Sequence, residues 1–234
     1  MPEHSSIRAL LQLTLTPGFG PVLIERALGM FGSADDVLGA SASALRRIRG
    51  VGDERAQSLR KGLNESERLA DRELAAAERL GVTLLARGSA EYPALLAPIP
   101  SSPPILYVRG RFVLERDRYS VALVGSRHCT AYGVEQAERF ATHLAQAGLT
   151  IVSGGARGID TAAHRATLRT TGRTIVVSGC GLAHSYPPEN AELFDRIVAE
   201  DRGAVVSELP LETSPSPENF PARNRIISAL SLGV

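Results

Sequence analysis

The chain has 234 residues, enough for one large domain or for a medium and a small one. Its composition, 44% hydrophobic and 22% charged, is typical of a globular protein, and a net charge of +1 means that any nucleic-acid site must be a local basic patch. The sequence has no apolar run of membrane-spanning length and no signal-peptide pattern at its start, and Cys129 and Cys180 are too far apart to make a disulfide scaffold. We therefore expect a cytoplasmic protein with no membrane partner.

Residues 1–80 are predicted to form a small helical domain whose turns are marked by glycines. A weak internal repeat lies inside it: residues 18–20 are Gly-Phe-Gly and residues 50–52 are Gly-Val-Gly. The second copy, followed by Ala56 and Leu59, fits the helix-hairpin-helix signature, in which backbone N–H groups contact phosphates without reading bases. Basic residues surround this hairpin, namely Arg46, Arg47, Arg49, Arg55, Arg60 and Lys61. A hairpin that serves only packing or protein binding explains the pattern equally well.

Residues 81–234 alternate between short apolar strands and helices, which predicts an α/β domain with a Rossmann-like parallel sheet covered by helices on both faces. A helix over 63–80 is expected to join this domain to the first. The expected strands are 82–86, 105–108, 119–124, 150–152, 174–177 and 204–206, and the expected helices are 134–147, 161–171, 188–200 and one from residue 221 or 222. Ligands of such sheets bind beyond the carboxyl ends of the strands, so the loops after the strands are the places to search.

The glycine-rich loop at residues 153–160 follows the expected strand 150–152 and begins a helix. Gly154 and Gly155 allow a sharp turn and a close approach of the backbone to a ligand, and the helix start offers unpaired N–H groups to a phosphate. Arg157 adds a full positive charge beside that position. A tight turn without any ligand is the other interpretation of the same spacing.

The loop after strand 119–124 carries Ser126 and Arg127. An arginine at a strand end can donate two parallel hydrogen bonds to a phosphate. An internal ion pair of Arg127 with Asp160 or Glu208 would use the same side chain, and both possibilities remain open.

Further candidates follow the later strands. Tyr186 and Asn190 offer a flat ring and an amide, either to a ligand or to local turn structure. Arg223 and Arg225 lie in the expected first turn of the last helix, where the helix dipole disfavours cations, so a polyanion is expected to receive them. Phe220 is expected to be exposed and to stack on a base, an interaction of about 1–3 kcal/mol in single-strand binders.

Catalytic patterns are weak in this chain. Asp160 and His164 are four residues apart and share a helix face, which would suit an acid–base pair or two metal ligands. No third ligand is evident, and an aspartate at a helix start beside a hydrogen-bonded histidine explains the pair without chemistry. Neither a dinucleotide fingerprint nor a phosphate-binding lysine loop occurs. We expect no catalytic residue, no metal and no cofactor.

The motifs taken together resemble the DprA family, also called Smf, over residues 82–234. The motifs that carry the resemblance are Gly125-Ser126-Arg127 with Tyr132-Gly133, Ser153-Gly154-Gly155-Ala156 with Gly158-Ile159-Asp160, Tyr186-Pro187 with Asn190, and residues 220–228, Phe-Pro-Ala-Arg-Asn-Arg-Ile-Ile-Ser. The helical N-terminal part resembles, more loosely, the small SAM-like domain of many family members.

This resemblance implies a bacterial DNA-processing protein of natural transformation. Such a protein binds and protects incoming single-stranded DNA, helps to load the RecA recombinase, forms a homodimer through the Rossmann-like domain and has no established enzymatic activity. The resemblance, together with the charge of Arg157, gives the expected nucleic-acid-binding residues as Ser126, Arg127, Gly154, Gly155, Arg157, Asn190, Phe220, Arg223, Asn224 and Arg225.

Two departures from the family pattern are visible. Residues 216–218, Ser-Pro-Glu, provide no basic side chain ahead of Phe220. The sequence ends at residues 232–234, where another strand is expected to begin, so we expect an incomplete sheet domain with an exposed edge and a weakened dimer.

A nucleotide phosphoribohydrolase of the lysine-decarboxylase-like Rossmann type is the alternative function, although its Pro-Gly-Gly-x-Gly-Thr motif is absent. A third interpretation is a protein-interaction module.

Overall fold

The computed structural model describes residues 7–234, and the chain divides into two compact units. The helical unit holds the described residues up to Arg79 together with Leu84–Tyr92 and Ala97–Leu106, and the sheet unit holds Leu80–Thr83, Pro93–Leu96 and Tyr107–Val234. Among the described residues, no helix combines the length and apolar character needed to cross a membrane.

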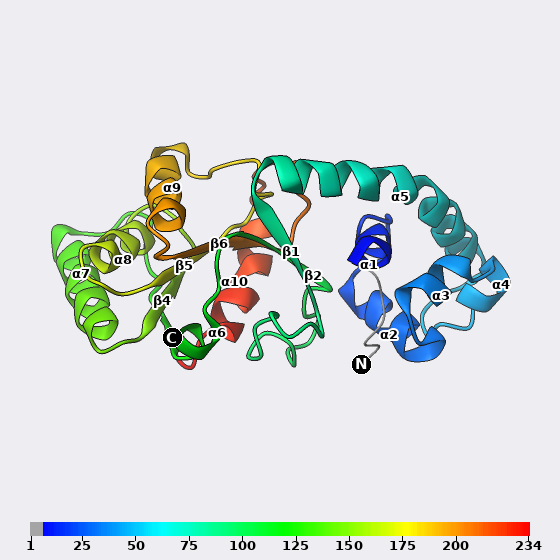
Figure 1. Cartoon of the computed structure of the whole chain (residues 1–234), viewed down its shortest axis with the longest axis horizontal. Coiled ribbons are helices and arrows are strands. Elements are labelled where there is room, and N and C mark those ends of the chain that lie inside the picture. The colour runs from blue at the N-terminus through cyan, green and yellow to red at the C-terminus, as the bar shows by residue number, and fades with distance from the viewer. Residues whose placement is uncertain (1–6) are drawn as a thin grey trace. The chain divides into compact units, whose positions relative to one another are not determined.

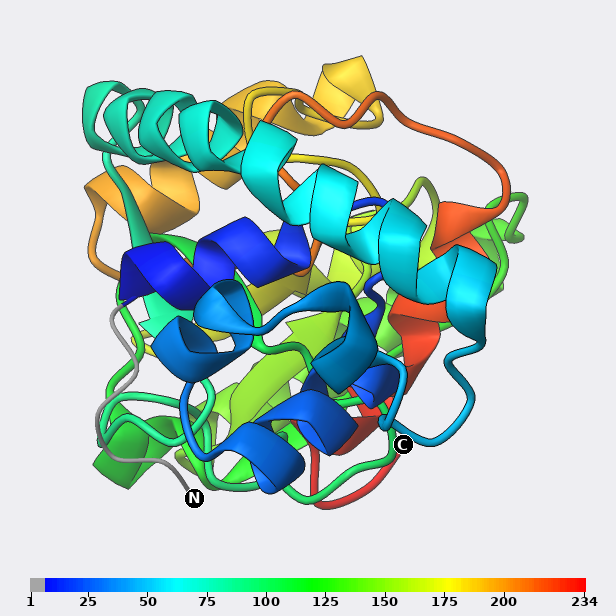
Figure 2. The same cartoon turned by 90° about the vertical axis from the view of Figure 1, so that its right-hand side faces the viewer.

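Five helices build the helical unit (Figures 1 and 2): α1 (Ile7–Thr14), α2 (Pro21–Phe31), α3 (Ala34–Gly39), α4 (Ala42–Leu45) and α5 (Asp53–Arg79). Side-chain oxygens cap the two short ones, because Ser33 accepts from the amide of Asp36 and Ser41 accepts from that of Ala44. Helix α1 packs along α5, and buried leucines of both helices form the core of the unit. The helix predicted over 63–80 is therefore the later part of one long helix that begins at Asp53.

Six strands form one sheet in the order β1-β2-β6-β5-β4-β3. Their bounds are β1 (Val82–Ala86), β2 (Ile105–Gly110), β3 (Ser120–Ala122), β4 (Thr150–Ser153), β5 (Thr174–Val177) and β6 (Gly203–Ser207). Strands β3 to β6 pair in parallel, whereas β2 pairs antiparallel with β6, from Tyr107 opposite Ser207 to Gly110 opposite Ala204. The predicted parallel sheet is thus present in β3 to β6, with one antiparallel pairing at β2. The crossover rule sets the direction only of consecutive strands joined by a helix, and β2 is not joined to β6 in that way.

Helices flank the sheet (Figure 1), which confirms the predicted α/β, Rossmann-like class. They are α6 (Leu114–Asp117), α7 (Ala131–Gln146), α8 (Ile159–Leu168), α9 (Ala191–Ala199) and α10 (Asn219–Ala229), with a 3₁₀ turn at Pro188–Asn190. Helices α7 and α8 pack on each other and on β4 through small side chains, among them Ala141, Ala145 and Ala163, around Ile151.

Most element boundaries differ from the predictions by a few residues, as three examples show. Strand β3 is shorter than 119–124, α8 begins at Ile159 instead of residue 161, and α10 begins at Asn219. The last difference arises because proline is tolerated throughout the first helical turn, so Pro221 did not mark the first helical residue.

The edge of the sheet at β3 is partly covered by the last residues of the chain. The amide of Leu232 donates to the Ser120 carbonyl at 2.8 Å, and the amide of Ala122 donates to the Gly233 carbonyl at 2.9 Å. The expected exposed edge is therefore paired with the chain over this part of β3.

Candidate nucleic-acid interface

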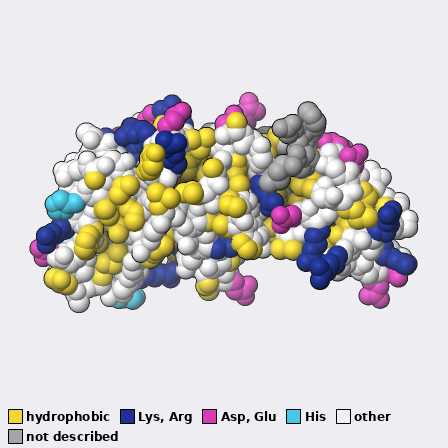
Figure 3. Space-filling view, turned by 90° about the horizontal axis from the view of Figure 1, so that it is seen from below, with side chains coloured by type: hydrophobic (Ala, Val, Ile, Leu, Met, Phe, Trp, Pro, Cys, Tyr) yellow, Lys and Arg dark blue, Asp and Glu magenta, His cyan; other side chains and the backbone are white. Residues whose placement is uncertain are grey.

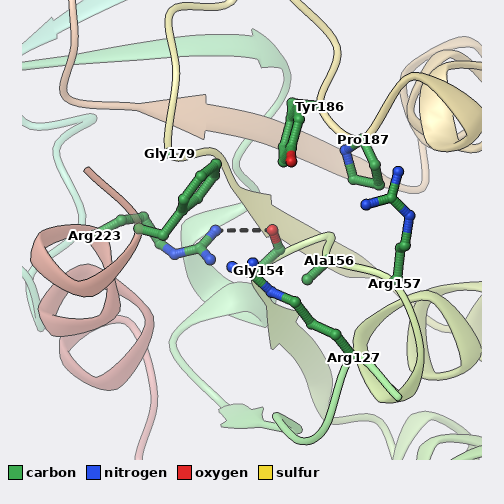
Figure 4. A pocket seen from close by; sticks show the side chains of 9 residues that line it. Arg127, Gly154, Ala156, Arg157, Gly179, Tyr186, Pro187 and Arg223 are labelled. Atoms are coloured by element: carbon green, nitrogen blue, oxygen red, sulfur yellow. Dashed lines mark hydrogen bonds between the residues drawn. The ribbon is translucent and has the colours of Figure 1, made fainter. Parts of the chain in front are cut away.

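Loops that follow β3, β4 and β5 meet the start of α10 beyond the carboxyl ends of the parallel strands. They enclose a pocket, shown in Figure 4, that is lined by Arg127, Gly154, Ala156, Arg157, Gly179, Tyr186, Pro187, Phe220 and Arg223. The structure thus brings together residues of four chain segments at the sheet edge where ligands of such folds bind.

The turn after β4 is held from inside by a carboxylate. Oδ2 of the buried Asp160 accepts from the amide of Gly154 at 3.0 Å and from that of Ala156 at 3.3 Å. Burial raises the pKa of Asp160, while these amides and the charge of Arg223 favour its ionised form. Two of the N–H groups that we predicted to receive a phosphate are therefore occupied. Within residues 7–234, the amides of Gly155, Arg157 and Gly158 have no hydrogen-bond acceptor.

Gly155 is required by both backbone conformation and space. Its φ is +65°, and a Cβ there would lie 2.7 Å from Cζ of Phe194 and 2.7 Å from Cγ1 of Val176. The buried Asn190 fixes the same turn, because its Nδ2 donates to the Gly155 carbonyl at 3.0 Å and to Oγ1 of Thr161 at 2.7 Å. Asn190 thus holds the turn and does not reach the surface.

Arg127 and Phe220 lie against each other at the pocket. The Arg127 guanidinium lies 5.1 Å from the centre of the Phe220 ring, and the rings of Phe220 and Tyr186 are 5.2 Å apart. A Cβ at Gly179 would come within 2.5 Å of the Phe220 ring, so this glycine makes room for the phenylalanine. Phe220 is half-buried rather than exposed as we predicted, because these neighbours cover it.

Arg127 itself is exposed, and among the described residues no carboxylate pairs with it. The two internal partners considered from the sequence are engaged elsewhere: Asp160 binds backbone amides and Glu208 pairs with Arg225. Ser126, which precedes Arg127 in the sequence, is also exposed, and the Ser126 hydroxyl accepts from the amide of His128 at 3.1 Å.

Arg223 is only 6% exposed and points inward (Figure 4). Its Nη1 donates to the carbonyl of Gly154 at 2.8 Å and also to that of Val177. Burial lowers the pKa of the Arg223 guanidinium, which the charge of Asp160 opposes. A Cβ at Gly154 would lie 2.5 Å from Nη2, so the glycine there leaves space for this guanidinium. Arg223 links the ends of β4 and β5.

The remaining predicted residues lie around the pocket. Because α10 begins at Asn219, Arg223 and Arg225 lie in its second turn, and the argument from a first-turn cation is wrong. Arg225 is half-buried, and Glu208, its ion-pair partner, has a pKa raised by burial.

Asn224 is exposed and lines an adjacent hollow that Arg127 also borders. Arg157 forms a half-exposed ion pair with Glu189, whose pKa is lowered by this hydrogen bond.

Asp160 and His164 do not form a catalytic pair. His164 is fully buried, and its Nδ1 lies 2.7 Å from Oγ1 of Thr174. The Thr174 hydroxyl donates to the Ile151 carbonyl, so Nδ1 must be the protonated nitrogen of His164. Burial lowers the pKa of His164 to about 3. Within the described part of the chain, no group of three or more potential metal ligands occurs.

The predicted binding residues do not include four residues that line the pocket, namely Ala156, Gly179, Tyr186 and Pro187. For Tyr186 the sequence left open whether its ring serves a ligand or local turn structure, and it gave Gly179 no role. The signal for Gly179 was present in the Gly-Cys-Gly at 179–181, which follows a strand as the other glycine turns do. The reason for a glycine at position 179 is the ring of Phe220, which lies 41 residues later in the sequence.

Comparison with known proteins identifies relatives of this chain. The family model for DNA recombination-mediator protein A matches residues 83–234. Protein Smf of Synechocystis is 38% identical over 93% of this chain and 54% of its own length. DNA processing protein DprA of Streptococcus pneumoniae is 43% identical over 61% of this chain and 49% of its own length. The chain therefore spans about half the length of these curated relatives.

Solved structures show the same similarity. DNA processing protein A of Streptococcus pneumoniae has a TM-score of 0.74 and 30% identity, with 97% of this chain and 76% of that chain covered. DNA processing protein A of Helicobacter pylori, studied for its single-stranded DNA binding mode, has a TM-score of 0.57 and 32% identity, with 64% of this chain and 66% of that chain covered.

Proposed function

Because the chain belongs to the DNA recombination-mediator protein A family, also called DprA or Smf, we propose that it binds single-stranded DNA at the pocket beyond β3, β4 and β5. In this proposal it works without catalysis in the cytoplasm during natural transformation. It protects the incoming strand and helps to load RecA, with a second copy of the chain and RecA as its protein partners.

The observation that carries the proposal is the pairing of Arg127 with Phe220. An exposed guanidinium that has no carboxylate partner among residues 7–234 is available to a phosphate, and an aromatic ring beside it is available to a base. Bases of a single strand are free to meet a ring, whereas those of a duplex are stacked inside it. The pairing therefore favours a single strand with little sequence choice, and the Helicobacter pylori relative supports this ligand.

The predicted site residues have two roles in this proposal. Those that reach the strand are Ser126, Arg127, Arg157, Phe220, Asn224 and Arg225; those that shape the turn are Gly154, Gly155, Asn190 and Arg223. Arg157 and Arg225 would exchange their carboxylate partners for phosphate. For Arg157 this costs little, because its ion pair with Glu189 is exposed to solvent.

The test uses Arg127→Ala and Phe220→Ala in the full chain, with Arg139→Ala as the control because Arg139 is also exposed in the sheet unit. Affinity for a labelled single strand is measured by fluorescence anisotropy over a range of salt concentrations. Arg127→Ala should weaken binding and reduce the salt slope by about 0.7, the value for one phosphate contact on a single strand. Phe220→Ala should weaken binding without changing the slope, because stacking releases no counterions.

The control variant should bind as the unchanged chain does. The pocket assignment is wrong if Arg127→Ala and Phe220→Ala both bind like the control while their circular dichroism spectra show an intact fold. Tighter binding to a duplex than to a single strand in the unchanged chain would contradict the proposed ligand.

A further inference from the structure

The helical unit contains two hairpins with the same local structure. The first joins α1 to α2 over residues 16–20, and the second joins α4 to α5 over residues 48–52. The amide of Phe19 donates to the Thr16 carbonyl, and the amide of Val51 donates to the Ile48 carbonyl, both at 3.0 Å. The residues before them, Gly18 and Gly50, have positive φ, and the side chains of Phe19 and Val51 are buried. The weak repeat in the sequence is therefore a repeat in structure.

Arginines from the helices that follow tie the two hairpins together. Arg55 of α5 donates to the carbonyl of Gly18 at 3.0 Å and to that of Gly50 at 3.3 Å. Arg26 of α2 donates to the carbonyl of Arg49 at 2.9 Å. Both hairpins are consequently held beside each other at a fixed spacing, and each arginine keeps further N–H groups for an external ligand.

The last glycine of each hairpin stands directly before a helix, where its carbonyl accepts the first hydrogen bonds of α2 or of α5. Gly20 and Gly52 are exposed, neither has a positive φ, and a Cβ at either would meet no atom within 4 Å. Among the described residues, their amides have no hydrogen-bond acceptor. A residue with a side chain would fit the fold at both positions, so the bare backbone is open to something outside the chain.

The surface around the hairpins carries an excess of positive charge. Arg26, Arg47, Arg49 and Arg55 are exposed, and in the described structure none of them pairs with a carboxylate. Arg46 is balanced by Asp53, and Glu54 is the nearby acid at the start of α5. Lys and Arg side chains of the helical unit are visible in Figure 3. Because the whole chain has a net charge of only +1, this is a local concentration.

We propose that this surface, formed by the two hairpins with Arg26, Arg47, Arg49 and Arg55, binds the phosphates of double-stranded DNA. It is a second site, separate from the single-strand pocket of the sheet unit. Charge complementarity and open amides match a phosphate backbone, which they contact without reading sequence. Of the two aromatic rings in residues 7–79, Phe19 is buried and Phe31 is the last residue of α2, at the opposite end of that helix from the first hairpin. The hairpins themselves therefore lack the stacking platform that a single strand requires.

The test measures binding of the full chain to a short blunt duplex and to a single strand of the same length, by anisotropy over a salt series. Arg47→Ala with Arg49→Ala should weaken duplex binding and reduce the salt slope by about 1.8, at about 0.9 per lost contact on duplex DNA. Binding of the single strand should not change. The matched control is Arg68→Ala with Arg72→Ala, which removes the same charge from an exposed part of α5 far along the helix.

A second pair of variants tests the open backbone. Gly52→Ala should preserve the fold and weaken duplex binding, because the added methyl group keeps the phosphate from the amide. Gly29→Ala, a substitution in α2 that also meets no atom within 4 Å, should leave duplex binding unchanged. The proposal is overturned if the hairpin variants bind duplex as their controls do, or if Arg127→Ala abolishes duplex binding, which would assign the duplex to the sheet pocket. Loss of single-strand binding in Arg127→Ala alone concerns only the function proposed above.

Discussion

Arg127 and Arg223 border the same pocket, but their surroundings give them different tasks. Arg127 is exposed and lies against an aromatic ring, whereas Arg223 is buried and donates to two main-chain carbonyls. Because the Arg223 side chain is buried as well as bonded to these carbonyls, it cannot reach a phosphate without breaking those bonds. We therefore treat Arg127 as a contact residue and Arg223 as a positioning residue in the proposed site.

Arg223→Lys tests this division. A lysine keeps the charge but lacks the planar fork that reaches two carbonyls, so the free energy of unfolding should fall by about 1.5–3 kcal/mol, the range for hydrogen bonds to a charged group. Urea unfolding followed by circular dichroism measures the loss. Single-strand binding should weaken because the Gly154 turn is less well held, while its salt slope stays that of the unchanged chain. A reduced slope would instead identify Arg223 as a phosphate contact.

His164 should make the sheet unit sensitive to acid. Its pKa is about 3 in the folded protein against 6.5 as its ordinary value, because burial disfavours the charged ring. Below pH 6.5 the unfolded chain binds a proton that the folded chain does not, so the free energy of unfolding decreases as the pH falls from 6.5 towards 3. This group alone contributes about 1.4 kcal/mol per pH unit in that window.

The comparison is with His164→Asn, which retains a donor near Thr174 but cannot be protonated. Both proteins are unfolded in urea at about pH 7.5 and about pH 5.5, on either side of the ordinary histidine pKa. The variant should be less stable at the higher pH but should lose less stability between the two. Equal losses would show that His164 does not cause the acid sensitivity.

At the scale of elements, the β4–α8 turn depends on glycine for a different reason from the turn that ends α7. Gly155 and Gly148 both have positive φ, at +65° and +89°. A Cβ at Gly155 would collide with Phe194 of α9 and Val176 of β5, whereas a Cβ at Gly148 would meet no atom within 4 Å. The first glycine is thus required by packing between elements as well as by its own backbone.

Alanine at the two positions should separate these effects. Gly148→Ala should cost about 1–2 kcal/mol of unfolding free energy, the penalty of a left-handed conformation. Gly155→Ala should cost about 1–3 kcal/mol more, because overpacking is added. Chemical denaturation of both variants measures the difference. If the two variants were equally stable, the turn would have room that the structure does not show.

For the whole molecule, the near-zero net charge means that attraction to DNA is local to each proposed site. The exposed cations of the sheet pocket and those of the helical hairpins belong to different compact units. Because each unit has its own core, a ligand is expected to stabilise mainly the unit that it contacts.

Hydrogen exchange of the full chain can follow both sites at once. A single strand should slow exchange of the amides of Gly155, Arg157 and Gly158, and a duplex should slow exchange of the Gly52 amide, since a bound phosphate occupies these open N–H groups. Each ligand should leave the other segment unchanged. Protection of the same segment by both ligands would indicate one shared site.

The sequence alone determined the class of the fold, the positions of the glycine turns and the family, since these depend on local patterns. Alternating apolar strands and helices set the α/β class, and glycine where a strand meets a helix marked the turns at residues 125 and 154–155. The position of Arg127 after a strand and that of Phe220 beside the start of the last helix also followed from short motifs. Such signals act over a few residues, so they can be recognised without the tertiary structure.

Only the tertiary structure decided which of these groups are free. Arg223 and the Gly154 carbonyl are 69 residues apart in sequence, and Arg225 and Glu208 are 17 apart. The antiparallel direction of β2 is set by its pairing with β6, which is far away in sequence. The amides of the turn after β4 are occupied because the chain folds back there and brings Asp160 to them. A side chain's partners depend on the packing of the whole unit, because burial and hydrogen bonding are decided by neighbours in space rather than by neighbours in sequence.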